Sequence, residues 1–156
     1  MKKILSLVPV LGFLFALVAC GATPTRLGTS DLSILLPDGY APAEDDLEED
    51  QVAYFYKDEN SIDFDVYQWE KGDQYTLESE AQVFAAFYGT EAEAVTVNGL
   101  KGMKYVSIEQ FEGATYTVVN YMFEDDTYIV ELAFWTVDTD AEYADVEEII
   151  GTLKRN

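Results

Sequence analysis

The chain contains no histidine and a single cysteine, Cys20. Nucleophilic catalysis by serine–histidine or cysteine–histidine pairs needs a histidine as base, so both kinds of catalytic site are excluded. Zinc sites built from cysteine and histidine are excluded for the same reason. A single cysteine also forms no disulfide within the chain, so a hydrophobic core must provide the stability. With 156 residues, one domain is the expected number.

Basic residues are scarce, because 9 lysines and arginines stand against 30 aspartates and glutamates, for a formal net charge of −21. An electrostatic field of this sign repels phosphate backbones. We therefore expect that the protein binds no nucleic acid. Two explanations of the acidity remain open at this point, namely solubility and the attraction of a basic partner or a cation.

A glycine-rich loop that could hold phosphate groups is also missing, because Gly99 and Gly102 fall inside a predicted hairpin and do not open a helix. A pair of carboxylates could in principle hydrolyse a glycosidic bond. With 30 acidic residues, however, some pair always has a suitable spacing, so this pattern carries no information. We expect no cofactor and no catalytic activity.

Long hydrophobic runs are absent as well, since a helix that spans a bilayer needs about 20 apolar residues. The longest run, residues 4–19, is shorter, contains a proline and follows two lysines, which is typical of a secretory signal peptide. It ends in Leu17-Val18-Ala19-Cys20, which resembles the bacterial lipobox. The resemblance implies cleavage before Cys20 and attachment of a diacylglyceryl group to its sulfur. The alternative is a buried, unreactive thiol.

These features predict a signal peptide at residues 1–19, a flexible tether at residues 20–30 and a single domain at residues 31–154. The tether prediction rests on glycine, proline, serine and threonine without hydrophobic periodicity. Two or more acyl chains hold a protein stably on a membrane. We therefore expect the protein on the extracytoplasmic face of a bacterial cell-envelope membrane, anchored through Cys20.

Hydrophobic periodicities of two and of 3.6 alternate along the predicted domain. The strongest hairpin signal is Asn98-Gly99, and Pro37–Asp50 is predicted to be a loop. Strands are predicted at residues 32–36, 51–57, 62–69, 93–97, 100–109, 114–124 and 127–136, and helices at residues 77–88 and 140–153.

The ends of both helices carry capping signals. Ser79 with Gln82 predicts a capping box for the first helix, and Gly89 stands where a helix commonly ends. Thr139 with Glu142 predicts a capping box for the second helix.

The strand predicted at residues 127–136 is mostly apolar on both faces, which indicates that each face of the sheet is covered. The element order is strands, helix, strands, helix. The predicted fold class is therefore α+β, with an antiparallel β-sheet flanked by α-helices. Phe84, Ile149 and Leu153 are expected in the core, because they lie on the apolar stripes of the two helices.

An opening strand that ends in "LLPDGY", a middle helix, a "TVNGLKG" hairpin, long antiparallel strands and a closing amphipathic helix together resemble the Mog1/PsbP-like superfamily. The resemblance covers about residues 31–154. It implies an α/β/α sandwich and an accessory, binding role rather than catalysis. It carries over no binding residue, because no position here matches a ligand set of the family.

The strand predicted at residues 62–69, which follows the one at residues 51–57 in a hairpin, has a mixed face. Its period of two separates Ile62, Phe64 and Val66 from acidic and aromatic side chains on the other face. Aromatic platforms with carboxylates suit sugars or cationic groups. The alternative is a core face under a helix with acids at its edge. The candidate ligand face consists of Asp63, Asp65, Tyr67 and Trp69, joined by Glu131 and Trp135 from another strand.

Two acidic stretches could suggest a metal, namely Asp45–Asp50 and Asp138-x-Asp140-x-Glu142. Neither has the glycine that an EF-hand loop needs at its sixth position, and carboxylates are common where a helix begins. We expect a solvated loop and a helix start, and no metal site.

Our leading hypothesis is a monomeric, lipid-anchored binding protein whose partner is another envelope protein. The alternative is a small-ligand or cation-binding module that uses the acidic and aromatic face.

Overall fold

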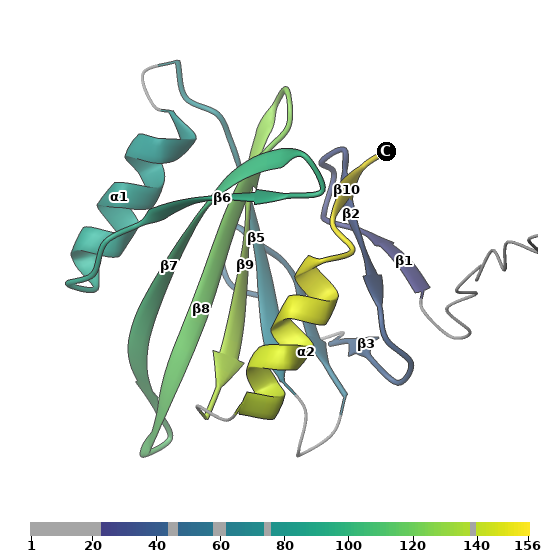
Figure 1. Cartoon of the computed structure of the whole chain (residues 1–156), viewed down its shortest axis with the longest axis vertical. Coiled ribbons are helices and arrows are strands. Elements are labelled where there is room, and N and C mark those ends of the chain that lie inside the picture. The colour runs from purple at the N-terminus through teal and green to yellow at the C-terminus, as the bar shows by residue number, and fades with distance from the viewer. Residues whose placement is uncertain (1–22, 44–46, 58–61, 74–75, 138–139) are drawn as a thin grey trace, which may run out of the picture.

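The computed structural model describes residues 23–43, 47–57, 62–73, 76–137 and 140–156. In these ranges the chain forms two antiparallel sheets and two helices, α1 (Leu77–Phe87) and α2 (Asp140–Ile150) (Figure 1). The smaller sheet has the order β1-β2-β10, with β1 (Thr23–Arg26), β2 (Leu32–Leu36) and β10 (Lys154–Arg155). The main sheet has the order β3-β4-β5-β9-β8-β7-β6, with β3 (Ala41–Pro42), β4 (Gln51–Tyr56), β5 (Asp63–Glu70), β6 (Glu93–Val97), β7 (Leu100–Phe111), β8 (Ala114–Glu124) and β9 (Tyr128–Thr136).

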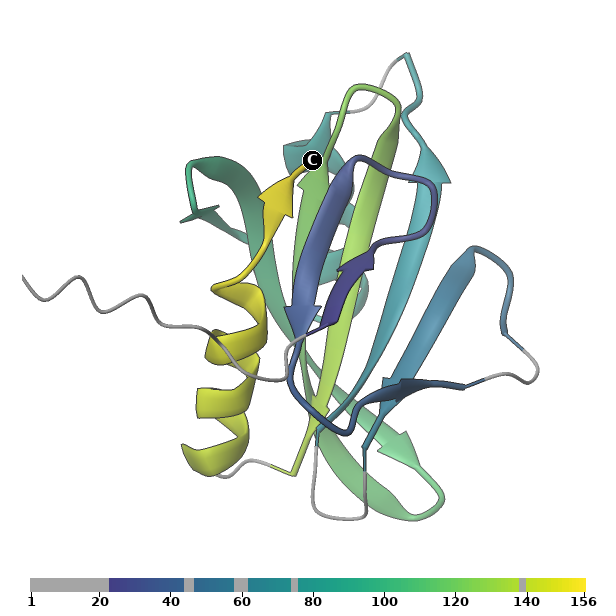
Figure 2. The same ribbon diagram turned by 90° about the vertical axis from the view of Figure 1, so that its right-hand side faces the viewer.

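The main sheet is the middle layer of the molecule. One of its faces carries α1, and the other carries α2 together with the smaller sheet (Figures 1 and 2). This arrangement confirms the predicted α+β class with flanking helices. In the described ranges, neither helix has the length and apolar character that crossing a bilayer requires.

The face of the main sheet toward α2 is a closed hydrophobic core. The ring of Phe64 stacks between those of Phe55 and Phe134, with centroid distances of 5.0 and 4.9 Å. Ile149 of α2 and Leu153 after it are almost completely buried, as predicted. The helix itself ends at Ile150, three residues earlier than predicted, because the chain turns there toward β10.

The face toward α1 has a smaller apolar core. Ala81 and Ala85 let the helix approach the sheet closely, and they pack on Met103, Met122 and Ile129. Phe84 was expected to be buried but is half-buried, because it lies at the margin of this core against Trp69.

The cap of α1 lies one turn earlier than predicted. Thr76 Oγ1 accepts from the N–H of Ser79 at 3.1 Å, and Ser79 Oγ accepts from the N–H of Thr76 at 2.9 Å. Ser79 is therefore the third helical residue of the box rather than its first member. Gln82 instead donates to the carbonyl of Ala92. Gly89 has the positive φ of 72° that ends many helices, as predicted.

The predicted cap of α2 lies partly outside the described residues, because these do not include Thr139. Its other member, Glu142, accepts a hydrogen bond from the N–H of Val137 at 3.2 Å. In its described residues, 37–43 and 47–50, the predicted loop contains a short strand, β3, which pairs with β4. The hairpin at Asn98-Gly99 is confirmed, because Val97 pairs with Leu100.

The predicted flexible tether at residues 20–30 is wrong from residue 23 onward. Thr23–Arg26 forms β1, which pairs antiparallel with β2, and Leu27 is 1% exposed. The strand was missed because it has four residues, and its stability comes from backbone pairing with β2 rather than from a periodic apolar pattern. The signal peptide, Cys20 and the first part of the predicted tether lie outside the described residues.

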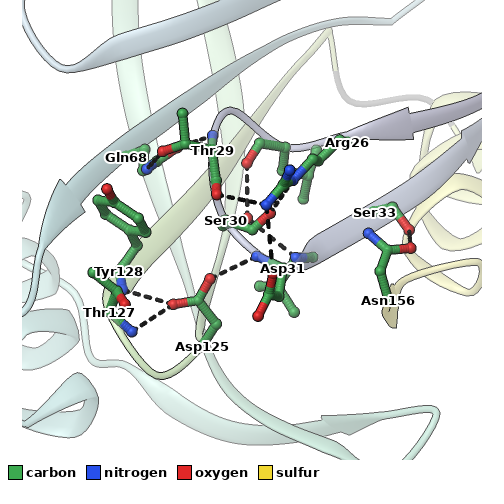
Figure 3. A network of polar contacts seen from close by, with 12 residues as sticks. Arg26, Thr29, Ser30, Asp31, Ser33, Gln68, Asp125, Thr127, Tyr128 and Asn156 are labelled. Atoms are coloured by element: carbon green, nitrogen blue, oxygen red, sulfur yellow. Dashed lines mark hydrogen bonds and ion pairs between the residues drawn. The ribbon is translucent and has the colours of Figure 1, made fainter.

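The turn between β1 and β2 is held by two side chains that are distant in the sequence, Gln68 of β5 and Asp125 of the turn between β8 and β9 (Figure 3). Gln68 of β5 accepts from the N–H of Thr29 and donates to its hydroxyl, at 2.8 and 2.6 Å. Asp125 accepts from the N–H groups of Asp31, Thr127 and Tyr128, each at 2.7 Å. Residues 23–31 are thereby integrated into the domain.

Candidate functional site

The face of the main sheet that carries α1 is covered at only one end. Beyond the apolar core under the helix, the same face forms the floor of an open cleft of about 860 Å³. We call this the acidic cleft. Its walls are α1 on one side and the segment before β4 on another. Its acidic lining residues are Glu48, Glu49, Asp50, Asp65, Glu80, Glu109 and Glu131, and its aromatic ones are Tyr67, Trp69, Phe84, Tyr88, Tyr105, Phe111 and Trp135.

Five of the six residues predicted for a ligand face line the acidic cleft. The strand register explains why, since Tyr67 of β5 lies opposite Glu131 of β9 and the two strands present alternate residues to the same side. Asp63 shares this face but does not line the cleft, and its carboxylate accepts from the Tyr54 hydroxyl at 2.7 Å. Those in the cleft are Asp65, Tyr67, Trp69, Glu131 and Trp135.

Asp65 lies on the floor of the cleft and is buried. Its two carboxylate oxygens accept from Gln51 Nε2 and from the indole N–H of Trp135, both at 2.6 Å. Burial raises the pKa of Asp65 to about 6, although these two hydrogen bonds act in the opposite direction. Among the described residues, the donors to this carboxylate are both neutral.

Glu131 is the second buried carboxylate of the acidic cleft, with 6% of the residue exposed. The hydroxyl of Tyr105 donates to its Oε1. Burial raises the pKa of Glu131 to about 7; the hydrogen bond from Tyr105 opposes this shift, and the negative charges of Glu109 and Asp65 add to it. Burial also raises the pKa of Tyr105, which keeps this phenol protonated as a donor.

Aromatic rings form the rest of the lining. Trp69 packs against Phe84 of α1, with ring centroids 5.7 Å apart, and Tyr88 stacks on Tyr105 at 6.3 Å. The rings of Trp135 and Tyr116 of β8 meet edge to face, with centroids 5.7 Å apart. The cleft thus combines flat apolar surfaces with two buried carboxylates.

Sequence reasoning missed the contributions of α1, β7 and β8. Tyr105 and Glu109 lie on the same face of β7, and Asn120 lies opposite Tyr105 on β8. The period of two in β7 was a usable signal, but only the order of the strands shows that this face adjoins β9. Glu48–Asp50, predicted as part of a solvated loop, borders the cleft.

The lining has a one-sided charge. Among the residues that the structure describes, no lysine or arginine lines the acidic cleft. The ion pairs described in the molecule are elsewhere, for example between Lys71 and Glu124. In the described ranges, no group of three or more acidic or cysteine side chains is placed to hold a metal ion.

Comparison with known proteins places the fold. No protein-family model and no curated protein sequence matches the chain. The solution structure of cyanobacterial PsbP (CyanoP) from Synechocystis sp. PCC 6803 is similar, with a TM-score of 0.64 and 12% sequence identity over 94% of this chain and 99% of that one. A crystal structure from Bacteroides thetaiotaomicron VPI-5482 is also similar, with a TM-score of 0.58 and 18% identity over 84% of this chain. This chain spans about half of that protein, 49% of its length.

The chain therefore has a Mog1/PsbP-like fold, as its sequence resemblance predicted. At identities of 12% and 18%, the likeness concerns the fold, and function has to be argued from the site.

Proposed function

We propose that this protein is a non-catalytic binding domain, anchored by lipid on the extracytoplasmic side of a bacterial membrane, which takes a ligand into the acidic cleft. The cleft is the observation that carries the proposal. Its volume of about 860 Å³ lies within the roughly 300–1,000 Å³ that is usual for small-molecule sites. Its aromatic walls and few buried polar groups are also typical of such sites.

The chain supplies its own reporter for this proposal. Both of its tryptophans, Trp69 and Trp135, line the acidic cleft, so tryptophan fluorescence reports on the cleft directly. We would titrate the full-length protein in detergent with amines, neutral sugars, carboxylates and short peptides, and follow fluorescence and thermal unfolding together. A ligand of the cleft shifts both signals saturably, because binding to the folded state stabilises it. A panel in which no compound moves either signal would contradict the proposal.

The lipid anchor is supported by the sequence, through the signal-like run and the lipobox-like residues that end at Cys20. Changing Cys20 to Ser should leave a precursor that keeps residues 1–19 and incorporates no labelled fatty acid. The measurement is metabolic labelling followed by mass spectrometry of the amino terminus. Normal lipid labelling of the variant would exclude the anchor.

A protein partner remains the second candidate, and an open strand edge favours it. β6 pairs with β7 only along Leu100–Lys104, so in the described part of the chain the outer edge of residues 105–111 pairs with no strand. Val106 and Ile108 are exposed there, at 37% and 62%. Such an edge can accept a strand from another protein. A photo-crosslinker at position 108, compared with one at exposed Glu91, should then give a specific adduct in envelope preparations.

A further inference from the structure

We infer that the ligand of the acidic cleft is an organic cation, an amine, guanidinium or quaternary ammonium compound whose positive group lies between Asp65 and Glu131. This inference rests on the proposed binding function and names its ligand class. It follows from the charge of the lining, the burial of the two carboxylates and the nature of the walls.

The two carboxylates lie close together on the cleft floor. Asp65 is opposite Ala133 and Glu131 is opposite Tyr67, so the two acids are diagonal neighbours on adjacent antiparallel strands. Diagonal neighbours of this kind lie roughly 7–8 Å apart, with their Cβ atoms somewhat closer. One ammonium or guanidinium group placed between them can reach an oxygen of each.

Neither carboxylate has a cationic partner in the described part of the molecule. Asp65 accepts from an amide and an indole, and Glu131 accepts from a phenol. Among the described residues, none donates to Oε2 of Glu131, and no buried side-chain oxygen lacks a partner, so this oxygen is open to the cleft. A buried carboxylate without a counter-ion is unfavourable, and a bound cation supplies the missing charge and donor.

The walls favour an organic cation over a metal ion. Tyr67, Trp69 and Trp135 offer aromatic surface beside the carboxylates, and the face of an aromatic ring attracts an organic cation. A bare metal ion instead needs several oxygens converging at short distance. In the described ranges no such group of side chains is present. A cleft of about 860 Å³ also has room for the carbon skeleton of an organic molecule.

The test uses probes that share a shape and differ in charge. The cations are phenethylammonium, phenethylguanidinium and benzyltrimethylammonium, the neutral match is phenethyl alcohol, and the anion is 3-phenylpropanoate. The full-length protein is titrated at pH 8, with tryptophan fluorescence and thermal unfolding as readouts. We expect at least one cation to bind saturably and at least tenfold more tightly than the neutral match, and the anion to bind more weakly still.

Isosteric variants locate the charge. Glu131→Gln and Asp65→Asn should each weaken cation binding at least tenfold and leave binding of the neutral probe within threefold of wild type. Glu91→Gln, an exposed acid outside the cleft, is the matched control and should change neither. Thermal unfolding of each variant without a probe shows that it is folded. Should one variant fail to fold, the other still decides the question.

The pH dependence gives a second readout. The pKa values of Asp65 and Glu131 are raised to about 6 and about 7, so cation binding should tighten between pH 5 and pH 8. This pH dependence should disappear in a variant that combines Asp65→Asn with Glu131→Gln. The other titratable groups around them are Glu48, Glu49 and Asp50 before β4, Tyr54 of β4, Asp63 and Tyr67 of β5, Glu80 of α1, Tyr88 after α1, and Tyr105 and Glu109 of β7. None of these gains positive charge at any pH.

The outcomes separate this inference from the proposed function. If the neutral or anionic probe bound in the cleft as tightly as the cations, the cation would be the wrong class and the cleft would still be a binding site. If variants of both acids bound cations as wild type does, the inference would also be overturned. If no probe bound, the inference would fail, and the wider panel described above would decide the proposed function.

Discussion

The two faces of the main sheet are built from alternate residues of the same strands but differ in what covers them. On β9, Leu132 and Phe134 point into the core under α2 and are fully buried. Their neighbours Glu131 and Trp135 point to the other face and line the acidic cleft. One face therefore carries the larger core, and the other carries a smaller core under α1 and the open acidic cleft. Changes at adjacent positions should separate the contributions of the two faces.

The largest expected effect is on the closed face. Phe134→Ala removes a fully buried ring that stacks on Phe64 at 4.9 Å, and we expect it to lower the free energy of unfolding by about 3–5 kcal/mol. Trp135→Phe, one residue further, keeps a ring and loses one hydrogen bond, so it should cost about 0.5–1.5 kcal/mol. Urea denaturation measures both. Equal losses would mean that the two faces contribute alike.

The next effect tests how firmly the C-terminal segment belongs to the closed face. Leu153 lies after α2 and is fully buried, so Leu153→Ala should cost about 2–5 kcal/mol as a large-to-small core change. The midpoint of chemical unfolding measures it. A loss below about half a kilocalorie per mole would show that this segment is not docked on the sheet.

The third effect belongs to the cleft face and depends on pH. Because the pKa of Glu131 is raised from 4.5 to about 7, the folded protein holds this proton more tightly than the unfolded chain does. The group's stabilising contribution is complete below pH 4.5 and is lost as the pH rises through 7. Between pH 4.5 and 8, wild type should therefore lose about 2–3 kcal/mol relative to Glu131→Gln.

Denaturation of both proteins at several pH values measures this difference. Glu91→Gln is exposed and should follow wild type throughout. A constant difference between wild type and Glu131→Gln would show that the cleft carboxylate behaves like one on the surface.

The smallest expected effect concerns calcium. Glu48–Asp50 borders the cleft, but neither acidic stretch has the glycine turn of an EF-hand loop. We expect no stoichiometric calcium site, and only a weak response that disappears in salt, since exposed charges are screened beyond about 8–10 Å at physiological ionic strength. Isothermal titration in salt of that strength, about 150 mM, measures it. A calcium site of micromolar affinity would contradict this prediction and would favour a metal ion over an organic cation as the ligand.

Much of the fold could be predicted from the sequence, because long amphipathic elements carry their own signals. The alternation Ile62, Phe64, Val66 identified the closed face of β5 correctly. β1 was missed, since its four residues are held by pairing with β2 rather than by any local pattern. The predicted cap of α1 is three residues too late, because Thr76 and Ser79 both carry a hydroxyl that can cap a helix and Gln82 fits the usual third position of a box that begins at Ser79.

The candidate site was predictable only in part, for a different reason. Asp65 and Tyr67 are on one strand, so their common face follows from a period of two. Tyr105, which holds Glu131, is 26 residues away from it in the chain, and only the order β9-β8-β7 brings the two side chains together. Contacts across strands depend on topology, which local patterns do not specify.

The early start of β1 has a consequence for how the protein would stand on a membrane. Thr23 follows Cys20 by three residues, so their Cα atoms lie at most about 11 Å apart, given 3.8 Å per step. With a lipid on Cys20, as we propose, this short connection would hold the domain close to the lipid headgroups and restrict its reorientation. The smaller sheet, which begins at Thr23, lies on the face of the main sheet opposite the acidic cleft. Such an attachment would orient the opening of the acidic cleft away from the bilayer and toward the solvent.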